Sequence, residues 1–213
     1  MKKVIAINGS PRKNANTATL LQKTLDGAAS AGAETEMIHL IDLKYQGCIS
    51  CFACKLKNSK YIGACALKDD LSPVLEKAMA ADALVLGSPI YIGDITGRMR
   101  SFIERFAFMN VSYSNKNHFH SPPKKNGAFI YTMNVTKLQS KLYTYVYMMN
   151  TGVLKKFGGY TAQLLSKNTY QFNDYELYDA SNFDVNKKEK TRKNIFPKDC
   201  ETAYNIGIDL VNK

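Results

Sequence analysis

The chain has 213 residues, 45% of them hydrophobic, which suits one domain (1–213) around one core. No apolar run approaches the roughly 20 residues that a membrane-spanning helix needs. The basic start of the chain is followed by too short an apolar stretch for a signal sequence. We therefore expect a cytoplasmic protein without a membrane partner.

The formal net charge of +11 raises the question of a nucleic-acid partner. Of the 29 basic residues, 24 are lysine and only five are arginine, and the lysines are scattered. Surfaces that read phosphates and bases usually recruit arginine for its bidentate fork. We therefore expect a solvated lysine surface that attracts anionic substrates, and no nucleic-acid partner.

Short β-branched runs alternate with amphipathic helices along the chain. In the helix 96–108, for example, Met99, Phe102 and Phe106 keep helical spacing. Five strands that alternate with helices predict a parallel sheet covered on both faces, and the polar stretch 187–197 is expected at the surface. The predicted strands are 3–8, 35–40, 83–87, 127–132 and 160–165, and the predicted helices are 16–31, 71–80, 96–108, 138–157 and 199–211.

The first loop with chemical character, Gly9–Thr17, joins the first predicted strand to a helix that Asn16 or Thr17 can cap. Free backbone N–H groups and the helix dipole attract an anion at such a place. Ser10 adds a neutral donor, as do the two capping candidates, and Arg12 offers a fork for phosphate oxygens. The glycines of a Walker A loop or a dinucleotide-binding turn are missing. The alternative is an ordinary loop with a threonine cap.

The second loop, Gly87–Gly97, follows the third predicted strand and also begins with Ser-Pro. The first and third strands flank the switch point of the flavodoxin-like strand order, where ligands bind. The stretch from Pro89 to Gly93 can lay backbone amides and the ring of Tyr91 beside a flat heterocycle. A packing loop with a buried tyrosine is the alternative.

Together, Gly9-Ser-Pro-Arg-x-x-x-Asn-Thr and Ser88-Pro-Ile-Tyr-x-Gly-x-x-x-Gly resemble motifs of the NAD(P)H-dependent FMN reductase family. The resemblance is closest to the branch that contains the iron–sulfur flavoproteins, and it runs from Met1 to about Thr132. It implies a flavodoxin-like α/β fold, a three-layer α/β/α sandwich with a five-stranded parallel sheet in the order 2-1-3-4-5.

The resemblance also implies where FMN would bind. The first loop would hold the phosphate, the second would line the isoalloxazine ring and the ribityl chain, and a third loop after the fourth strand would close the far side of the ring. That third loop lacks the glycine of many relatives. The implied residues are Ser10, Arg12, Asn16, Thr17 and Ala18 in the first loop, Pro89, Ile90, Tyr91, Ile92 and Gly93 in the second, and Thr132, Met133 and Asn134 in the third.

The activity that the resemblance implies is that of an FMN-dependent oxidoreductase. It would take hydride from NAD(P)H and pass electrons to a quinone, a nitro or azo compound, free flavin or an iron–sulfur acceptor. Because the flavin carries this chemistry, no catalytic side chain is predicted. The alternative is a one-electron carrier, flavodoxin-like or iron–sulfur, without NAD(P)H activity.

Members of the family commonly form dimers or tetramers, so a homodimer or homotetramer is expected. The aromatic residues of the helix 138–157 could supply the contact surface or could belong to the core. The tyrosine-rich segment Tyr170–Phe183 could cover the flavin as a lid, from the same chain or from a neighbouring subunit. In the helix 138–157, the residues that could form the contact surface are Tyr143, Tyr145, Tyr147 and Met148.

Four of the five cysteines lie close together in the sequence. Cys48, Cys51 and Cys54 have the C-x2-C-x2-C spacing that wraps thiolates around one corner of a [4Fe–4S] cluster, and Cys65 could be the fourth ligand. The gap before Cys65 is typically shorter in the iron–sulfur flavoproteins. A cluster, a zinc or redox-thiol site, and small buried residues all remain open. Cys200 lies apart from these four, on the last predicted helix, where a packing role is expected.

Overall fold

Parallel strands form the centre of the computed structural model, which describes residues 1–114, 119–120 and 124–213. The order of the long strands is β2-β1-β3-β5-β6. This is the predicted order 2-1-3-4-5, because the short β4 (Asp94–Ile95) pairs only with the end of β3 and runs antiparallel to it. The long strands are β1 (Lys3–Asn8), β2 (Glu34–His39), β3 (Ala83–Tyr91), β5 (Lys125–Thr132) and β6 (Gly158–Ser166).

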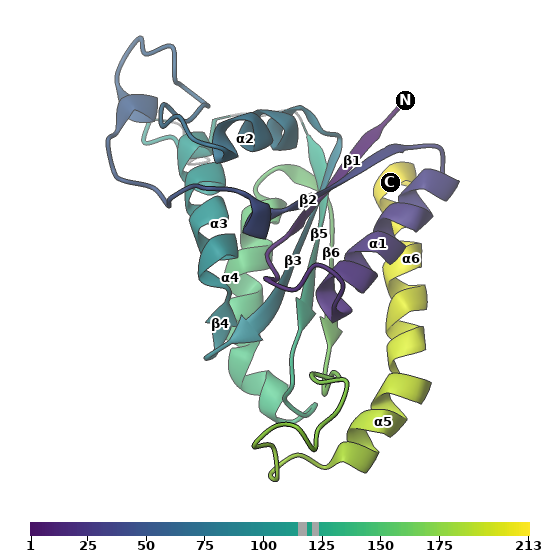
Figure 1. Ribbon diagram of the computed structural model, residues 1–213. Helices are drawn as coiled ribbons and strands as arrows, with labels where there is room; N and C mark the ends of the chain where they lie inside the picture. Colours follow the sequence, from purple (N-terminus) through teal and green to yellow (C-terminus); the bar gives the residue numbers. More distant parts are fainter. Residues whose placement is uncertain (115–118, 121–123) are drawn as a thin grey trace.

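Helices cover both faces of the sheet and complete a three-layer sandwich (Figure 1). Two of them, α1 (Asn16–Ser30) and α6 (Phe196–Asn212), pack side by side on one face. The opposite face carries α2 (Leu71–Ala80), α3 (Gly97–Asn110) and α4 (Thr144–Lys155). Within the described residues, no helix has the length and apolar character to cross a membrane.

Each strand supplies both layers of the core, because successive side chains of a strand point to opposite faces. In β1, Val4 and Ala6 pack in the cluster with α1 and α6, whereas Ile5 and Ile7 pack in the cluster with α2, α3 and α4. All four side chains are fully buried. Continuous apolar runs such as Val4–Ile7 are typical of parallel strands that are covered on both sides.

Two glycines allow α1 and α6 to approach closely. A Cβ atom added to Gly27 would lie 1.9 Å from the carbonyl oxygen of Tyr204, and one added to Gly207 would lie 1.9 Å from that of Thr24. Neither distance is compatible with any side chain. The pairing of these two helices therefore depends on glycine at both positions.

The C-terminal third differs most from the prediction. The helix expected over 138–157 begins as a 3-10 helix (Gln139–Tyr143) and continues as α4. Within it, Tyr147 is buried, whereas Tyr145 and Met148 are exposed. The polar stretch 187–197 contains most of a separate helix, α5 (Val185–Asn194), whose first turn is capped by the carboxylate of Asp184.

The start of α1 also differs from the prediction. Ala15 occupies the N-cap position, and Asn16 and Thr17 are the first helical residues, so neither caps the helix. Their side chains point to other partners: the Asn16 amide donates to the carbonyl of Tyr170, and the Thr17 hydroxyl meets that of Thr132. The helix therefore begins without a side-chain cap from the described residues.

A glycine-to-alanine substitution at the helix contact should be costly. We expect Gly207→Ala to lower the free energy of unfolding by about 2 kcal/mol or more, because the new methyl group must displace the backbone of α1. Gly152→Ala in α4 is the control, since its Cβ would meet no atom within 4 Å. That variant should gain up to about 1 kcal/mol from helix propensity. Equal effects in urea unfolding would contradict the close-contact argument.

Candidate functional site

The first and second loops are joined at the carboxyl edge of the sheet. The backbone N–H of Gly9 donates to the carbonyl of Gly87 (2.8 Å), and the Thr96 hydroxyl donates to the carbonyl of Gly9 (2.8 Å). The N–H of Thr96 donates in turn to the hydroxyl of Ser88 (3.0 Å). These bonds hold the loops after β1 and β3 at a fixed separation, as the predicted switch point requires.

The third loop joins the first through two buried hydroxyl groups. The oxygens of Thr17 and Thr132 lie 2.8 Å apart. Met133 is buried in the core, and the hydroxyl of Tyr147 donates to its sulfur (3.2 Å). Asn134, next along the chain, is half-buried at the edge. All three predicted loops thus meet at one edge of the sheet, but the side chain of Met133 packs behind them.

The first loop is ordered by its own side chains. The side-chain oxygen of Asn8 accepts from the N–H of Ser10 (2.9 Å), and the hydroxyl of Ser10 accepts from the N–H of Arg12 (3.1 Å). Ala18, on the first turn of α1, is buried. Because this turn has no side-chain cap among the described residues, its N–H groups offer an anion site.

The second loop is a tight hairpin that the sequence did not reveal. Strand β3 continues through Pro89 and Ile90 to Tyr91, turns at Ile92 and Gly93, and returns as β4. Ile92 (φ 49°) and Gly93 (φ 84°) both adopt left-handed backbone conformations. A β-branched residue is strained there, and the side chain of Ile92 is fully exposed. The hairpin therefore presents a strained apolar tip at the rim of the site.

The segment after β6 covers the first loop from the same chain. The Arg12 guanidinium donates to the carbonyl of Gln171 (2.6 Å), and the Asn16 amide donates to that of Tyr170 (2.8 Å). A cavity of about 910 Å³ lies between the first loop and this segment. Its lining includes Arg12, Asn14, Asn16, Tyr170, Phe172, Tyr178 and Arg192.

Two cations of α5 reach the same loops, although no sequence motif marks them. Lys188 is buried, and its ammonium donates to the side-chain oxygen of Asn134. Arg192 donates to the side-chain oxygen of Asn16 (3.1 Å). Burial lowers the pKa of Lys188 from its ordinary value. In a chain with 24 lysines, nothing in the sequence distinguishes the one that is buried.

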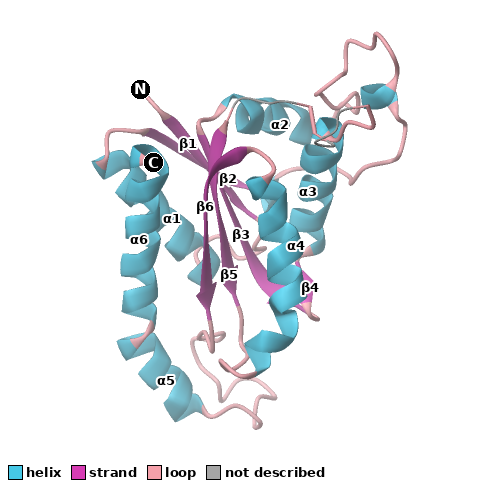
Figure 2. Ribbon diagram, turned by 180° about the vertical axis from the view of Figure 1, so that it is seen from behind, coloured by secondary structure: helices cyan, strands magenta, loops and turns pink. Residues whose placement is uncertain are grey.

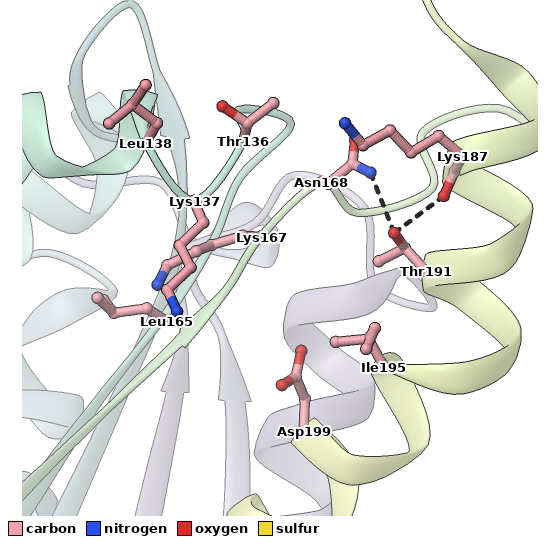
Figure 3. Close-up of a pocket in the computed structure, with 10 residues that line it drawn as sticks. All are labelled: Thr136, Lys137, Leu138, Leu165, Lys167, Asn168, Lys187, Thr191, Ile195 and Asp199. Carbon is pink, nitrogen blue, oxygen red and sulfur yellow. Dashed lines mark hydrogen bonds between the residues drawn. The ribbon is translucent and has the colours of Figure 1, made fainter.

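A second hollow, of about 640 Å³, lies between the end of β6 and the helices α5 and α6 (Figure 3). Lys137 and Lys167 extend side by side into it, and Asp199 lies on the opposite wall. The hydroxyl of Ser166 donates to Asp199 (2.6 Å), and burial, opposed by this bond and by Lys167, raises the pKa of Asp199. The lining contains none of the predicted flavin residues.

The cysteine loop lies at the other end of α3. All four clustered cysteines line one small cavity of about 20 Å³ together with Arg105 and Phe108. The ammonium of Lys55 fastens this loop to the C-terminus of α3 by donating to the carbonyls of Phe108 and Val111. Within the described part of the chain, no three cysteine, histidine or acidic side chains are grouped closely enough to hold a metal ion.

Arg105 is the charged residue beneath the cysteine loop, and the sequence analysis did not single it out. Its side chain is fully buried, and its guanidinium binds both carboxylate oxygens of Asp69 (2.8 and 2.6 Å) and the carbonyl of Leu67 (3.1 Å). Its Nε has no hydrogen-bond partner among the described atoms. Burial opposes the charge, but Asp69 and Cys65 outweigh it and raise the pKa of Arg105. The sequence signal for its burial was the occurrence of an arginine among the apolar positions of the helix 96–108.

The loop sites and the cysteine cavity are separated by most of α3. The second loop ends at Thr96, which caps the start of this helix, whereas Phe108 and Met109 line the cysteine cavity. The eleven helical steps from Gly97 to Phe108 span about 16 Å. Figure 1 shows the cysteine loop beyond α2 and α3, at the end of the sheet away from the arrowheads.

Comparison with known families and curated proteins gives three matches of note. The family model described as NADPH-dependent FMN reductase matches residues 2–140. An iron–sulfur flavoprotein of Archaeoglobus fulgidus is 40% identical over 126 residues, which cover 59% of this chain and 59% of that protein. One of Methanocaldococcus jannaschii is 36% identical over 115 residues, with 54% and 57% covered. The chain thus spans less than two thirds of the length of these relatives.

Solved structures share the fold at low sequence identity. An NAD(P)H:quinone oxidoreductase from Methanothermobacter marburgensis has a TM-score of 0.64 at 13% identity, covering 100% of this chain and 98% of that one. An azoreductase from Bacillus anthracis has a TM-score of 0.66 at 14% identity, with 98% and 100% covered. A flavodoxin from the domain Archaea has a TM-score of 0.51 at 14% identity, with 98% and 96% covered. These likenesses show the flavodoxin-like fold.

Removal of the buried arginine should destabilise the protein strongly. We expect Arg105→Met to lower the free energy of unfolding by about 3 kcal/mol or more, because Asp69 would lose its buried partner. Arg100→Met is the matched control on the same helix: its pair with Asp94 is solvent-exposed, so its loss should cost less than about 1 kcal/mol. Similar losses for the two variants in chemical unfolding would argue against a special role of the buried pair.

Proposed function

The chain belongs to the NADPH-dependent FMN reductase family, and on this premise we propose that it binds one FMN and acts as an NAD(P)H-dependent oxidoreductase. The observation that carries the proposal is the meeting of three loops at the carboxyl edge of the sheet. Gly9 is hydrogen-bonded to Gly87, and Thr17 is hydrogen-bonded to Thr132. Ligands of doubly wound sheets bind at such an edge.

The first loop suits the phosphate of FMN. The uncapped first turn of α1 offers N–H groups, and Arg12 lies beside it in the cavity of about 910 Å³. In the proposed complex, Ser10, Arg12 and the first residues of α1, namely Asn16, Thr17 and Ala18, hold the phosphate. Side-chain and backbone donors together give this loop the chemistry that a phosphate monoester requires.

The second and third loops would hold the remainder of the cofactor. Pro89, Ile90 and Tyr91 continue β3 beyond the sheet, and Tyr91 is about half exposed, so an apolar and aromatic wall stands at the edge. Thr132 pairs with Pro89 on the neighbouring strand β5, and Asn134 follows two residues later. When bound, FMN would accept the hydride and release the electrons. The chain's own residues would bind, orient and shield the cofactor, so no catalytic side chain is proposed.

The electron acceptor in this proposal is a small molecule (a quinone, a nitro or azo compound, or free flavin) or an iron–sulfur protein.

A homodimer or homotetramer and a cytoplasmic location belong to the same proposal. An exposed apolar face on the 3-10 helix and α4 supports an assembly, because large apolar patches commonly mark contact surfaces. This face is formed by Leu138, Leu142, Tyr145, Met148 and Met149.

We also propose an iron–sulfur cluster at Cys48, Cys51, Cys54 and Cys65. Four thiols around one cavity are the donor set that such a cluster uses, and the unpartnered Nε of Arg105 suits an anion there. The curated relatives bear the name iron–sulfur flavoprotein. The proposal rests on this donor chemistry alone. The described side chains are not grouped as a coordination sphere and their cavity is only about 20 Å³, so the loop would have to rearrange to hold a cluster.

Anaerobic titration with NADPH tests the proposed activity. The protein is loaded with FMN, desalted and followed by visible absorption while NADPH is added. We expect rapid bleaching of the flavin bands and their return when an acceptor such as a quinone is admitted. Retained flavin that NADPH and NADH bleach no faster than free FMN would point to a one-electron carrier. Colourless protein after desalting would reject the flavin site altogether.

Iron and acid-labile sulfide assays on anaerobically purified protein test the cluster. We expect both elements together with a broad visible absorption, and we expect Cys65→Ser to lose them because a thiolate ligand is removed. Cys200→Ser is the control, since this cysteine lies on α6 and does not line the cavity. Flavin bands without iron, even after reconstitution with ferrous iron and sulfide, would leave the cysteines to structural or thiol-redox roles.

A further inference from the structure

Two cations one helical turn apart on α5 face the loops proposed for FMN. Residues four apart on a helix share one face, and Lys188 and Arg192 have this spacing. Figures 1 and 2 show α5 beyond the arrowhead ends of the strands, beside the segment that follows β6. This helix lies outside the residues 2–140 that the family model matches, so it adds to what the family implies.

Lys188 is a buried cation, and its hydrogen-bond partners among the described residues are neutral. Only 2% of its surface is exposed, and its ammonium donates to the side-chain oxygens of Asn134 and Asn168 (3.3 Å for the latter) and to the carbonyl of Thr169 (3.3 Å). The ring of Phe183 lies 5.0 Å from the same nitrogen. A buried charge without an opposite charge is unfavourable, and its lowered pKa reflects this burial.

Arg192 extends the positive charge to the phosphate loop. Its guanidinium donates to the side-chain oxygen of Asn16 (3.1 Å) and lies 4.7 Å from the ring centre of Phe196. Together with Arg12 and one carboxylate, Asp174, it lines the cavity of about 910 Å³. Because Asn16 also donates to the carbonyl of Tyr170, Arg192 holds an amide that is fixed from both sides.

We propose that Arg192 is a positioning residue for the phosphate of FMN, acting through Asn16 and through its charge, and that Lys188, which does not line this cavity, adds its buried charge from behind the third loop. The inference rests on the proposed function. A phosphate monoester brings a charge of about −1.5 to −2, which would balance the buried cation that the described structure leaves with neutral partners. The pair would therefore favour FMN over riboflavin, which has the same ring system but no phosphate.

A purely structural role predicts something different. If α5 only fastens the segment after β6 to the first loop, removal of either cation should loosen the whole site. Binding of FMN and of riboflavin would then weaken by the same factor. The ratio of the two dissociation constants therefore distinguishes an electrostatic interaction with the phosphate from a purely structural attachment of α5.

The experiment measures FMN and riboflavin binding to the flavin-free full chain by titration calorimetry. We expect Arg192→Gln to weaken FMN binding by about 10-fold to 100-fold, the range for a charge-assisted hydrogen bond, and Lys188→Met to weaken it in the same direction through the loss of charge alone. Riboflavin binding should change less than about threefold. Lys190→Met removes the same charge from an exposed position of α5 and should leave both constants unchanged. Arg192→Lys keeps the charge and should retain most of the preference for FMN.

The outcomes that overturn the inference are distinct from those that overturn the proposed function. Equal weakening of both ligands, or an unchanged ratio, in the two charge-removing variants would reject the phosphate role while leaving the flavin site intact. A parent chain that binds riboflavin as tightly as FMN would do the same. A parent chain that binds neither would reject both proposals. If Lys188→Met fails to fold by circular dichroism, Arg192→Gln, at a less buried position, decides.

Discussion

A single geometric constraint underlies the proposed chemistry: parallel strands end at the same edge of the sheet. The loops after β1, β3 and β5 therefore meet without a dedicated framework. A few hydrogen bonds then fix their separation, notably from Gly9 to Gly87 and between the hydroxyls of Thr17 and Thr132. Close approach at Gly9 is part of this arrangement, since a Cβ there would lie 2.8 Å from the side chain of Met99.

The two candidate sites have opposite electrostatic designs. At the sheet edge, cations are anchored by neutral oxygens: Arg12 by the carbonyl of Gln171, Arg192 by the amide of Asn16. Beneath the cysteine loop, Arg105 is already paired with Asp69, and its Nε has no hydrogen-bond partner among the described atoms. The first cavity has two arginines and one carboxylate, Asp174, in its lining, whereas in the second the charge of Arg105 is balanced by Asp69. Helix α3 connects the two regions rigidly.

Much of the fold could be predicted from the sequence, because the strands are β-branched runs and the loops carry specific motifs. The bounds of β1 and α2 were predicted as the structure has them, and the strand order is confirmed. The hairpin at Ile92 was missed, since a left-handed isoleucine is contrary to ordinary turn preferences. The helix α5 was missed because its composition is polar and its packing against the first loop is a tertiary effect.

The candidate site was predicted in part, for reasons that individual residues illustrate. Motif residues such as Ser10 and Thr132 lie at the predicted edge because loop position follows from strand order. The side chain of Met133 lies in the core, which the motif could not show, since a residue after a strand can point to either side. Burial of Lys188 and of Arg105 depends on segments distant in sequence, so no local pattern announces it.

The close contact of α1 with α6 has a consequence for biosynthesis. Gly27 of α1 precedes Gly207, which allows α6 to seat against α1, by about 180 residues along the chain. Until these later helices are made, one face of α1 has no partner, and Asn16 lacks Arg192. During synthesis that face of α1 therefore stays uncovered until α6 has emerged, and the contact of Arg192 with the first loop can form only after α5 has been made.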